Sequence, residues 1–360
     1  MALDARLVTD RERTLFTIGA IFSGLVWAVA ILGTFGLGLI LGLSVGAFIL
    51  MAHALFLAHV RGNGVRVTQQ QLPELYERCQ AAAKKLGMAE LPDTYLLQSG
   101  GVLNAFATKL LSRKFIVIYS GLVANCEDPR ELDFVIGHEL GHHAAGHLKW
   151  NAFLIPFQIL PWLGPAYSRA REYTCDRAGY AVVEDVEVAS RALVVLAAGG
   201  KMASKVNLQA FADQRLSSGH FWMATMELNL SHPYLCKRVA AIQEFKAPGT
   251  VAAVGRNPWA YPLAPFFAVA TGGSVAASLM VMVAVTGVMA AVAIPNFTQY
   301  KQRVREAGER AEQQQQQLFD EMKKAEEPDA LDAVPTPEAE APPAPPVAVP
   351  PGPKHHQRKH

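Results

Sequence analysis

The longest apolar stretch of the chain covers residues 15–60 and contains no lysine, arginine or acidic residue. A single membrane span needs about 20 residues, so this stretch is long enough for two. Glycines within residues 33–38 offer a turn between the two spans. The pattern therefore predicts a short cytoplasmic N-terminus over residues 1–14, followed by a transmembrane helical hairpin. A cleaved signal peptide does not fit, because its apolar region covers only about 7–15 residues.

A mixed pattern of apolar and polar positions follows, over residues 65–250. Apolar residues at helical spacing predict a helix over Gln71–Leu86. Short runs of β-branched and aromatic residues predict strands over Thr94–Gln98 and Phe115–Tyr119. Further helices are predicted over residues 184–200, 207–217 and 235–245. The sequence therefore predicts an α+β domain that is mostly helical with a small sheet, joined to transmembrane helices.

The C-terminal part shows three further patterns. Residues 264–294 are apolar and long enough for one span. Residues 295–325 have the pattern of a charged, glutamine-rich helix, in which residues 305–324 could self-associate as a coiled coil. A single crossing by 264–294 would place Lys301 and the arginines behind it outside, against the positive-inside bias. Either that segment re-enters the membrane or the charges around the hairpin outweigh it. The Pro/Ala-rich residues 326–360 are predicted to be disordered.

Charge and cysteine content narrow the function classes. Arginines precede the hairpin, Arg61 and Arg66 follow it, and its tip is uncharged. The positive-inside rule then predicts a multi-pass protein of the cell (inner) membrane with its domain on the cytoplasmic side. A formal net charge of +2 is too small to indicate a nucleic-acid partner. The cysteines are scattered without a Cys-x-x-Cys pair, which argues against a cysteine zinc site and fits a reducing compartment.

The pattern that carries the most chemistry is His-Glu-x-x-His, formed by His138, Glu139 and His142. In a helix the two histidines lie one turn apart on one face and can bind the same ion. Glu139 is then placed to reach a metal-bound water rather than the metal. Asp128 suits the N-cap of such a helix and Pro129 its first position. A chance match in a histidine-rich helix is the alternative for the motif by itself.

A second pattern, Glu172-x-x-x-Asp176, lies downstream on another predicted helix. Catalytic zinc usually takes three protein ligands plus water, so two histidines leave the site one ligand short. We interpret Glu172 as that third ligand. Asp176 shares its helix face and could accept a hydrogen bond from the outer nitrogen of a ligand histidine. The alternative is an exposed acidic helix with neighbouring arginines as salt-bridge partners.

Together, these motifs resemble the gluzincin membrane metallopeptidases, the group of HtpX-like heat-shock proteases and CAAX prenyl proteases. The resemblance covers roughly Leu72 to Phe245. It extends to Asn104-Ala-Phe, to Phe115-Ile-Val-Ile-Tyr-Ser-Gly, and to Ser231-His232-Pro233 with Arg238 beyond it. The combined pattern is specific, whereas each piece alone is not.

The resemblance implies a zincin-type catalytic domain that binds one Zn²⁺ per chain. His138, His142 and Glu172 would be the ligands, and Glu139 would be the general base. His232 would lie near the metal, either stabilising the developing oxyanion or acting as an extra ligand.

Asn104, Ala105 and Phe106 fall between the two predicted strands. As part of an edge strand they could hold an extended peptide substrate by main-chain pairing. An ordinary hairpin arm is an equal alternative from the residues alone.

We therefore predict an integral-membrane zinc endopeptidase that acts on protein or peptide substrates while in contact with membrane lipid. The resemblance points to a role in membrane protein quality control. The competing hypothesis is a membrane-anchored chaperone or assembly factor with a structural or inactive zinc site.

Overall fold

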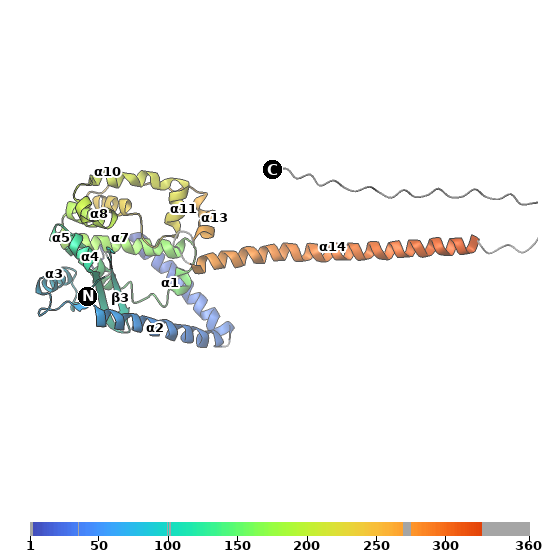
Figure 1. The fold of residues 1–360 in the computed structure, drawn as a ribbon, viewed down its shortest axis with the longest axis horizontal. Coiled ribbons are helices and arrows are strands. Elements are labelled where there is room, and N and C mark those ends of the chain that lie inside the picture. Colours follow the sequence, from blue (N-terminus) through green and yellow to red (C-terminus); the bar gives the residue numbers. More distant parts are fainter. Residues whose placement is uncertain (1–2, 35, 99, 101, 269–274, 326–360) are drawn as a thin grey trace, which may run out of the picture. The chain divides into compact units, whose positions relative to one another are not determined.

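Figure 1 shows the fold of a computed structural model, which describes residues 3–34, 36–98, 100, 102–268 and 275–325. The chain divides into two compact units, Met1–Met289 and Ala290–His360. The predicted fold class is confirmed, since the described residues are mostly helical with one small sheet. The helices are α1 (Asp10–Gly33), α2 (Leu37–Asn63), α3 (Pro73–Lys85), α4 (Ser120–Asn125), α5 (Pro129–Ala144), α6 (Ile155–Gln158), α7 (Leu163–Val183), α8 (Val186–Ala198), α9 (Gly200–Ala203), α10 (Leu208–Asp213), α11 (Phe221–Asn229), α12 (Leu235–Lys246), α13 (Ala260–Leu263) and α14 (Val275–Ala325), with 3₁₀ helices η1 (Gln214–Gly219) and η2 (Ala264–Phe267). The strands are β1 (Val65–Arg66), β2 (Asp93–Leu97), β3 (Ala105–Leu110) and β4 (Arg113–Tyr119).

The sheet has the strand order β1-β2-β4-β3. Strands β2 and β4 run parallel, whereas β1 and β3 are antiparallel to their neighbours. The central strand β4 is buried on both faces: Ile116 and Ile118 pack in the core with α3 and α5, and Phe115 and Val117 pack against the end of α2. Its β-branched and aromatic residues suit such a position. Strand β3 lies at an edge and is also the arm of a hairpin with β4, so both alternatives left open for its first residues describe it.

Helix α5 carries the His-Glu-x-x-His motif and is fixed at its start by local chemistry. The Asp128 side chain caps the helix by accepting a hydrogen bond from the Arg130 N–H at 2.8 Å. Leu132, Ile136 and Leu140 then turn into the core shared with α3 and the sheet. The apolar stripe of α5 therefore fixes which way the opposite, histidine-bearing face points.

Helices α5 and α7 pack closely because glycine occupies their contact positions. A Cβ atom on Gly179 would lie 2.6 Å from the backbone oxygen of Phe134, and one on Gly137 would lie 2.9 Å from the Gly179 Cα. Any larger residue would push the helices apart. This close approach brings the histidines of α5 within reach of Glu172 on α7.

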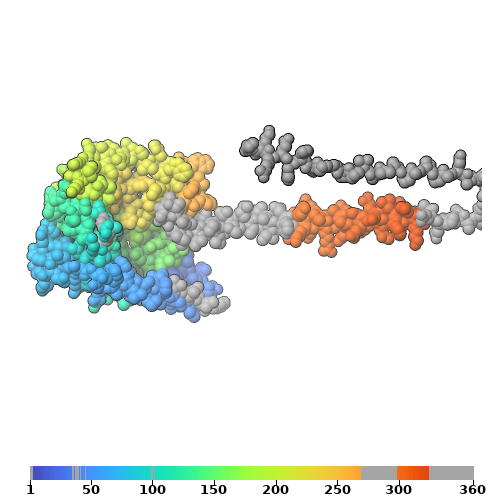
Figure 2. All heavy atoms as spheres, in the orientation of Figure 1, coloured from blue at the N-terminus to red at the C-terminus, as the bar shows by residue number. Residues whose placement is uncertain are grey.

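The predicted helical hairpin is formed by α1 and α2, with Gly36 in the left-handed conformation at the turn (φ 85°). Both contain windows long and apolar enough to cross a membrane, judged by length and composition. Many of their apolar side chains are exposed, including Leu25 at 64% and Phe48 at 66%. Figure 2 shows the α2 segment along the surface of the first unit. An apolar surface of this kind is what lipid-facing helices present.

One face of α1 is packed inside the protein rather than exposed. Leu15 lies in a buried cluster with Leu154, Phe157 and Tyr167, which belong to the segment between α5 and the middle of α7. The Trp27 indole N–H donates to the Phe153 carbonyl at 2.8 Å. The first helix of the hairpin is therefore joined directly to the domain that carries the His-Glu-x-x-His motif.

The second unit, Ala290–His360, is described as far as residue 325, where α14 ends. Its exposed surface carries pairs one helical turn apart, such as Arg305 and Glu309 at 3.0 Å. Such pairs stabilise a helix by about 0.2–0.5 kcal/mol each. Residues 269–274 of the span predicted over 264–294, and the tail predicted to be disordered over 326–360, lie outside the described residues, whereas residues 275–294 form the first part of α14.

Candidate metal centre

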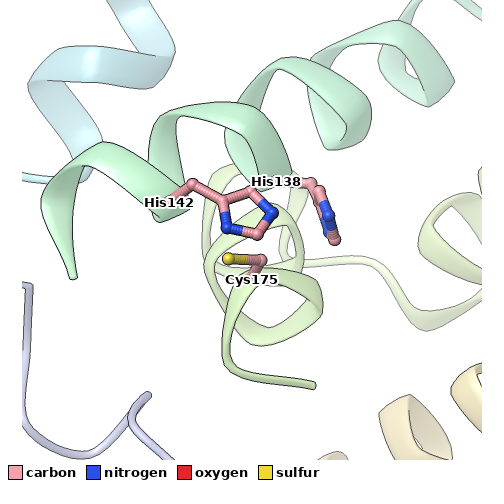
Figure 3. Close-up of side chains that lie close together, drawn as sticks. All are labelled: His138, His142 and Cys175. Atoms are coloured by element: carbon pink, nitrogen blue, oxygen red, sulfur yellow. The ribbon is translucent and has the colours of Figure 1, made fainter. Parts of the chain in front are cut away.

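Two imidazoles of α5 face one carboxylate of α7. His138 Nε2 lies 3.4 Å from Glu172 Oε2, and His142 Nε2 lies 3.5 Å from Glu172 Oε1. Figure 3 shows both histidines projecting from the same face of α5 towards α7. The structure thus brings together the three residues that the sequence suggested as ligands, although they come from two helices.

The geometry of this trio fits a zinc ion. The two nitrogen–oxygen separations are longer than hydrogen bonds, which span about 2.7–3.2 Å. Ligand atoms at about 2.0–2.1 Å from a tetrahedral zinc lie roughly 3.4 Å from one another. In addition, Glu172 Oε2 is buried and has no hydrogen-bond partner among the described residues. A buried carboxylate oxygen without a partner is costly, and a bound cation would remove that cost.

The outer nitrogen of His138 is held by a buried ion pair. His138 Nδ1 lies 3.0 Å from Asp176 Oδ1, so its N–H donates to the carboxylate and leaves Nε2 free to bind a metal. Asp176 also accepts two hydrogen bonds from the Arg238 guanidinium, at 2.6 and 2.8 Å. Burial alone would raise the pKa of Asp176, but Arg238 and His138 outweigh burial and lower it. The carboxylate therefore stays charged.

The outer nitrogen of His142 is held by a longer chain of contacts that ends on α1. His142 Nδ1 lies 3.0 Å from His147 Nδ1, and His147 Nε2 lies 2.8 Å from Glu12 Oε1. Because a carboxylate only accepts, His147 Nε2–H donates to Glu12, which leaves His147 Nδ1 to accept from His142. That arrangement again leaves the Nε2 lone pair of the ligand histidine free. Glu12 and His147 are both buried.

Cys175 offers a different third donor. Its sulfur and one nitrogen each of His138 and His142 all lie within 4.8 Å of one another, and Figure 3 shows the thiol below the His142 ring. However, burial and the nearby Glu172 raise the pKa of this thiol well above its ordinary value. Zinc binds the thiolate rather than the thiol. The carboxylate of Glu172 is charged already, since His138, His142 and Arg238 outweigh its burial and hold its pKa low. Glu172 is therefore the better ligand.

Glu139 lies beside the trio in a buried position. Burial is the main cause that raises its pKa, to about 7, while the neighbouring His138 and Arg238 act in the opposite direction. A carboxyl group with a pKa near neutrality can both accept and return a proton at physiological pH. Burial would lower the pKa of His138, but Asp176 and Glu172 raise it to about 10, so the site attracts positive charge at this position.

A cavity of about 320 Å³ opens onto this group of residues. His138, Glu139, Glu172 and His232 line it together with apolar side chains such as Phe134 and Leu193. The His232 ring reaches it from the solvent side, with Nε2 at 3.6 Å from Glu172 Oε1 and 64% of its side chain exposed. Its Nδ1 lies 2.9 Å from the Ser231 hydroxyl.

The segment around residue 105 forms one rim of this cavity. Asn104 and Ala105 line it, whereas Phe106 points away and packs against Phe56 and Tyr119 on the other face of the sheet. This follows from the alternation of side chains along β3. Of the three residues predicted to bind substrate, two therefore border the cavity with their side chains, and Phe106 does not.

Sequence reasoning missed Glu12 and His147. His147 lies beyond the end of α5, where it turns back to meet His142. The available signal was a pair of acidic residues, Asp10 and Glu12, in the first turn of an apolar helix. Nothing in the local pattern indicates that the two residues meet, because they are 135 positions apart.

Comparison with known proteins places these residues in context. Residues 68–160 and 151–246 match the family described as Peptidase family M48. The chain is 31% identical to the plastoglobule-localized metallopeptidase 48 of the chloroplast from Arabidopsis thaliana, over 54% of this chain and 63% of that protein. It is 32% and 31% identical to the Protease HtpX homologs of Pyrobaculum islandicum and Pyrobaculum aerophilum, over 45% of this chain and 43% of each.

The matched parts thus span less than two thirds of these relatives' own length. No solved structure matches the chain. The family match encloses α5 and α7 and ends at the last residue of α12.

Proposed function

We propose that this chain, which belongs to peptidase family M48, is a zinc-dependent endopeptidase anchored in a membrane. The observation that carries the proposal is the convergence of His138 Nε2 and His142 Nε2 on Glu172, at 3.4 and 3.5 Å. These three residues are the zinc ligands, one ion per chain. Asp176 orients His138 from outside the ligand shell, and the pair of His147 and Glu12 orients His142.

Glu139 is the general base. Its raised pKa of about 7 lets the carboxylate take a proton from the attacking water and return it to the leaving amine near neutral pH. When bound, zinc supplies Lewis-acid polarisation of that water and of the scissile carbonyl. His232 stands at the open side of the site, where its imidazole can donate a hydrogen bond to the developing oxyanion. One such donor is typically worth about 3–4 kcal/mol in the transition state.

The substrate is a protein or peptide bound in extended form along β3. This strand is an edge of the sheet and lies beside α5. Main-chain pairing with an edge strand gives affinity with little dependence on sequence. Asn104 and Ala105 contact the substrate near the metal, while Phe106 supports the strand from behind.

The helical hairpin holds this site at a membrane surface. The exposed apolar faces of α1 and α2 contact lipid, and Arg61 and Arg66 beyond the second helix favour the cytoplasmic side for the catalytic domain. A multi-pass protein of the cell (inner) membrane with this site suits the removal of damaged membrane proteins. The charged helix over residues 305–324 is a candidate surface for self-association.

The decisive experiment compares the wild-type protein with Glu139→Gln, both purified in detergent and loaded with zinc. We expect the wild type to cleave unfolded casein in a zinc-dependent manner. The variant should keep its zinc and lose at least about 100-fold in rate, the usual contribution of a general base. A variant as active as the wild type would remove Glu139 from this role. A zinc-loaded wild type that cleaves no unfolded substrate would refute the endopeptidase itself.

A further inference from the structure

A second cavity, of about 260 Å³, lies between the start of α1, the middle of α7 and α12. It shares no lining residue with the cavity at the metal centre. Its walls carry five basic side chains against two carboxylates, an excess of three positive charges. The basic residues are Arg11, Arg169, Arg215, Lys237 and Arg256, and the carboxylates are Glu227 and Glu244.

Both carboxylates already have partners. Glu227 accepts from Lys237 at 2.7 Å and from Arg256 at 2.9 Å, so this one carboxylate already faces two cations. Glu244 accepts the backbone N–H groups of Gly249 and Val251 at 2.7 and 2.8 Å. Arg215 is paired with Asp213, whose Oδ1 accepts from Arg215 Nη1 at 3.1 Å. Arg11 and Arg169 are therefore the basic residues of this wall that have no side-chain ion pair among the described residues.

Among the basic residues of this cavity, Arg169 gives the clearest indication of a missing hydrogen-bond acceptor. It is 4% exposed, and its Nη1 donates to the carbonyls of Glu227 and Leu230, at 2.6 and 2.7 Å, near the C-terminal end of α11. Its Nη2 is buried without a hydrogen-bond partner among the described residues, as is the Nε of Arg215. Burial is the main cause that lowers the pKa of Arg169, to about 10; the adjacent Arg256 charge acts in the same direction and Glu227 in the opposite one.

We propose that this cavity binds a phosphate-bearing anion, held by the free N–H groups of Arg169 and Arg215 and by the charge of Arg11. Guanidinium groups recognise phosphate through short, charge-assisted hydrogen bonds. A tetrahedral anion carries several acceptor oxygens, so it can accept from more than one guanidinium N–H group. Two sources share this chemistry: the head group of an anionic phospholipid and a free phosphate ion.

The position of the cavity relative to α1 makes a head group accessible. Arg11 lies one turn before Leu15, where the apolar part of α1 begins, a rise of about 6 Å. The exposed apolar side chains of α1 follow from Ile18 onward. When α1 spans a bilayer, Arg11 and the cavity mouth fall at head-group depth, where basic pockets bind anionic lipids.

The test uses the full chain in detergent and measures its melting temperature with added ligand. The probes are inorganic phosphate, a short-chain phosphatidylglycerol and a short-chain phosphatidylcholine, each against sodium chloride at equal ionic strength. The main variant is Arg11→Glu, an exposed site that leaves the buried arginines intact. Arg13→Glu is the matched control, because it makes the same charge change in the same turn but does not line the cavity.

We expect phosphatidylglycerol or phosphate to raise the melting temperature of the wild type and of Arg13→Glu. In Arg11→Glu the apparent affinity should fall at least about tenfold, the worth of one charge-assisted hydrogen bond. Arg169→Gln should lose the response as well, and its circular dichroism and metal content report whether it folds. Stabilisation by the lipid alone identifies the head group as the ligand, and stabilisation by phosphate identifies the free ion as sufficient. No stabilisation of the wild type by either probe, or equal losses in both Glu variants, would overturn the proposal.

Discussion

Glu12 is the residue through which the first hairpin helix reaches the proposed metal site, and replacing it tests the arrangement of the whole site. Its Oε1 accepts a hydrogen bond from His147 Nε2 at 2.8 Å, and both groups are buried. Glu12→Gln keeps an acceptor oxygen but removes the charge and places an amide N–H₂ where Oε2 has no partner. Glu12→Ala removes the acceptor as well, so that His147 no longer has a fixed orientation.

The expected effect is on zinc affinity. Removing an outer partner of a ligand histidine typically costs 10–100-fold in metal affinity, about 1.4–2.7 kcal/mol. We expect roughly tenfold for Glu12→Gln, because one hydrogen bond survives without its charge. We expect closer to 100-fold for Glu12→Ala, because the His147 N–H is then buried without an acceptor and His142 loses its support.

The assay titrates metal-free protein in detergent with zinc, in competition with a fluorescent chelator. The spectrum of the cobalt-substituted protein reports whether ligand geometry changes. Asp10→Asn is the control, since Asp10 lies in the same helical turn with its side chain 98% exposed. If Glu12→Ala binds zinc within about threefold of the wild type while folded, Glu12 does not position His142. Equal weakening in Asp10→Asn would instead assign the effect to the stability of α1.

Four further outcomes are expected. Glu172→Gln should lower zinc affinity by more than about tenfold without unfolding the protein; full zinc content in this variant would shift the third-ligand role towards Cys175. Asp176→Asn should weaken zinc binding and also lower the melting temperature, because it leaves the Arg238 charge without its partner at a cost of about 3–5 kcal/mol. Gly179→Ala should lower the free energy of unfolding by about 1–3 kcal/mol, because the added Cβ meets the Phe134 backbone. Gly308→Ala is the control and should not destabilise the protein, since a Cβ atom there has nothing within 4 Å. Similar melting temperatures for the two variants would contradict the close packing of α5 and α7. Burial raises the pKa of the Cys79 thiol to about 12. This thiol should therefore react with iodoacetamide at pH 8 about 1,000-fold more slowly than an exposed thiol, and its rate should increase as the pH rises towards 12. Rapid labelling at pH 8 would show that α3 opens.

Short-range patterns determined a large part of this structure from the sequence alone. The turn-by-turn spacing of His138 and His142 places them on one helix face wherever that helix sits, because the period of 3.6 residues is a property of the backbone. The length and apolar content of residues 15–60 likewise predict two long helices, with a turn at the glycines within residues 33–38. Glu172 and Asp176 share a face of α7 for the same reason, which is why they could be identified together.

The tertiary structure decided which of these faces meet. Glycines at 137 and 179 allow α5 and α7 to approach until the ligand atoms are 3.4–3.5 Å apart, a distance that no local pattern contains. The contact of Glu12 with His147 joins segments 135 positions apart and depends on α1 packing beside α7. The sequence therefore supplied the candidate ligands, and packing decided how they are oriented. The reason is that the hydrogen-bond partners of the outer imidazole nitrogens come from parts of the chain that only the fold brings together.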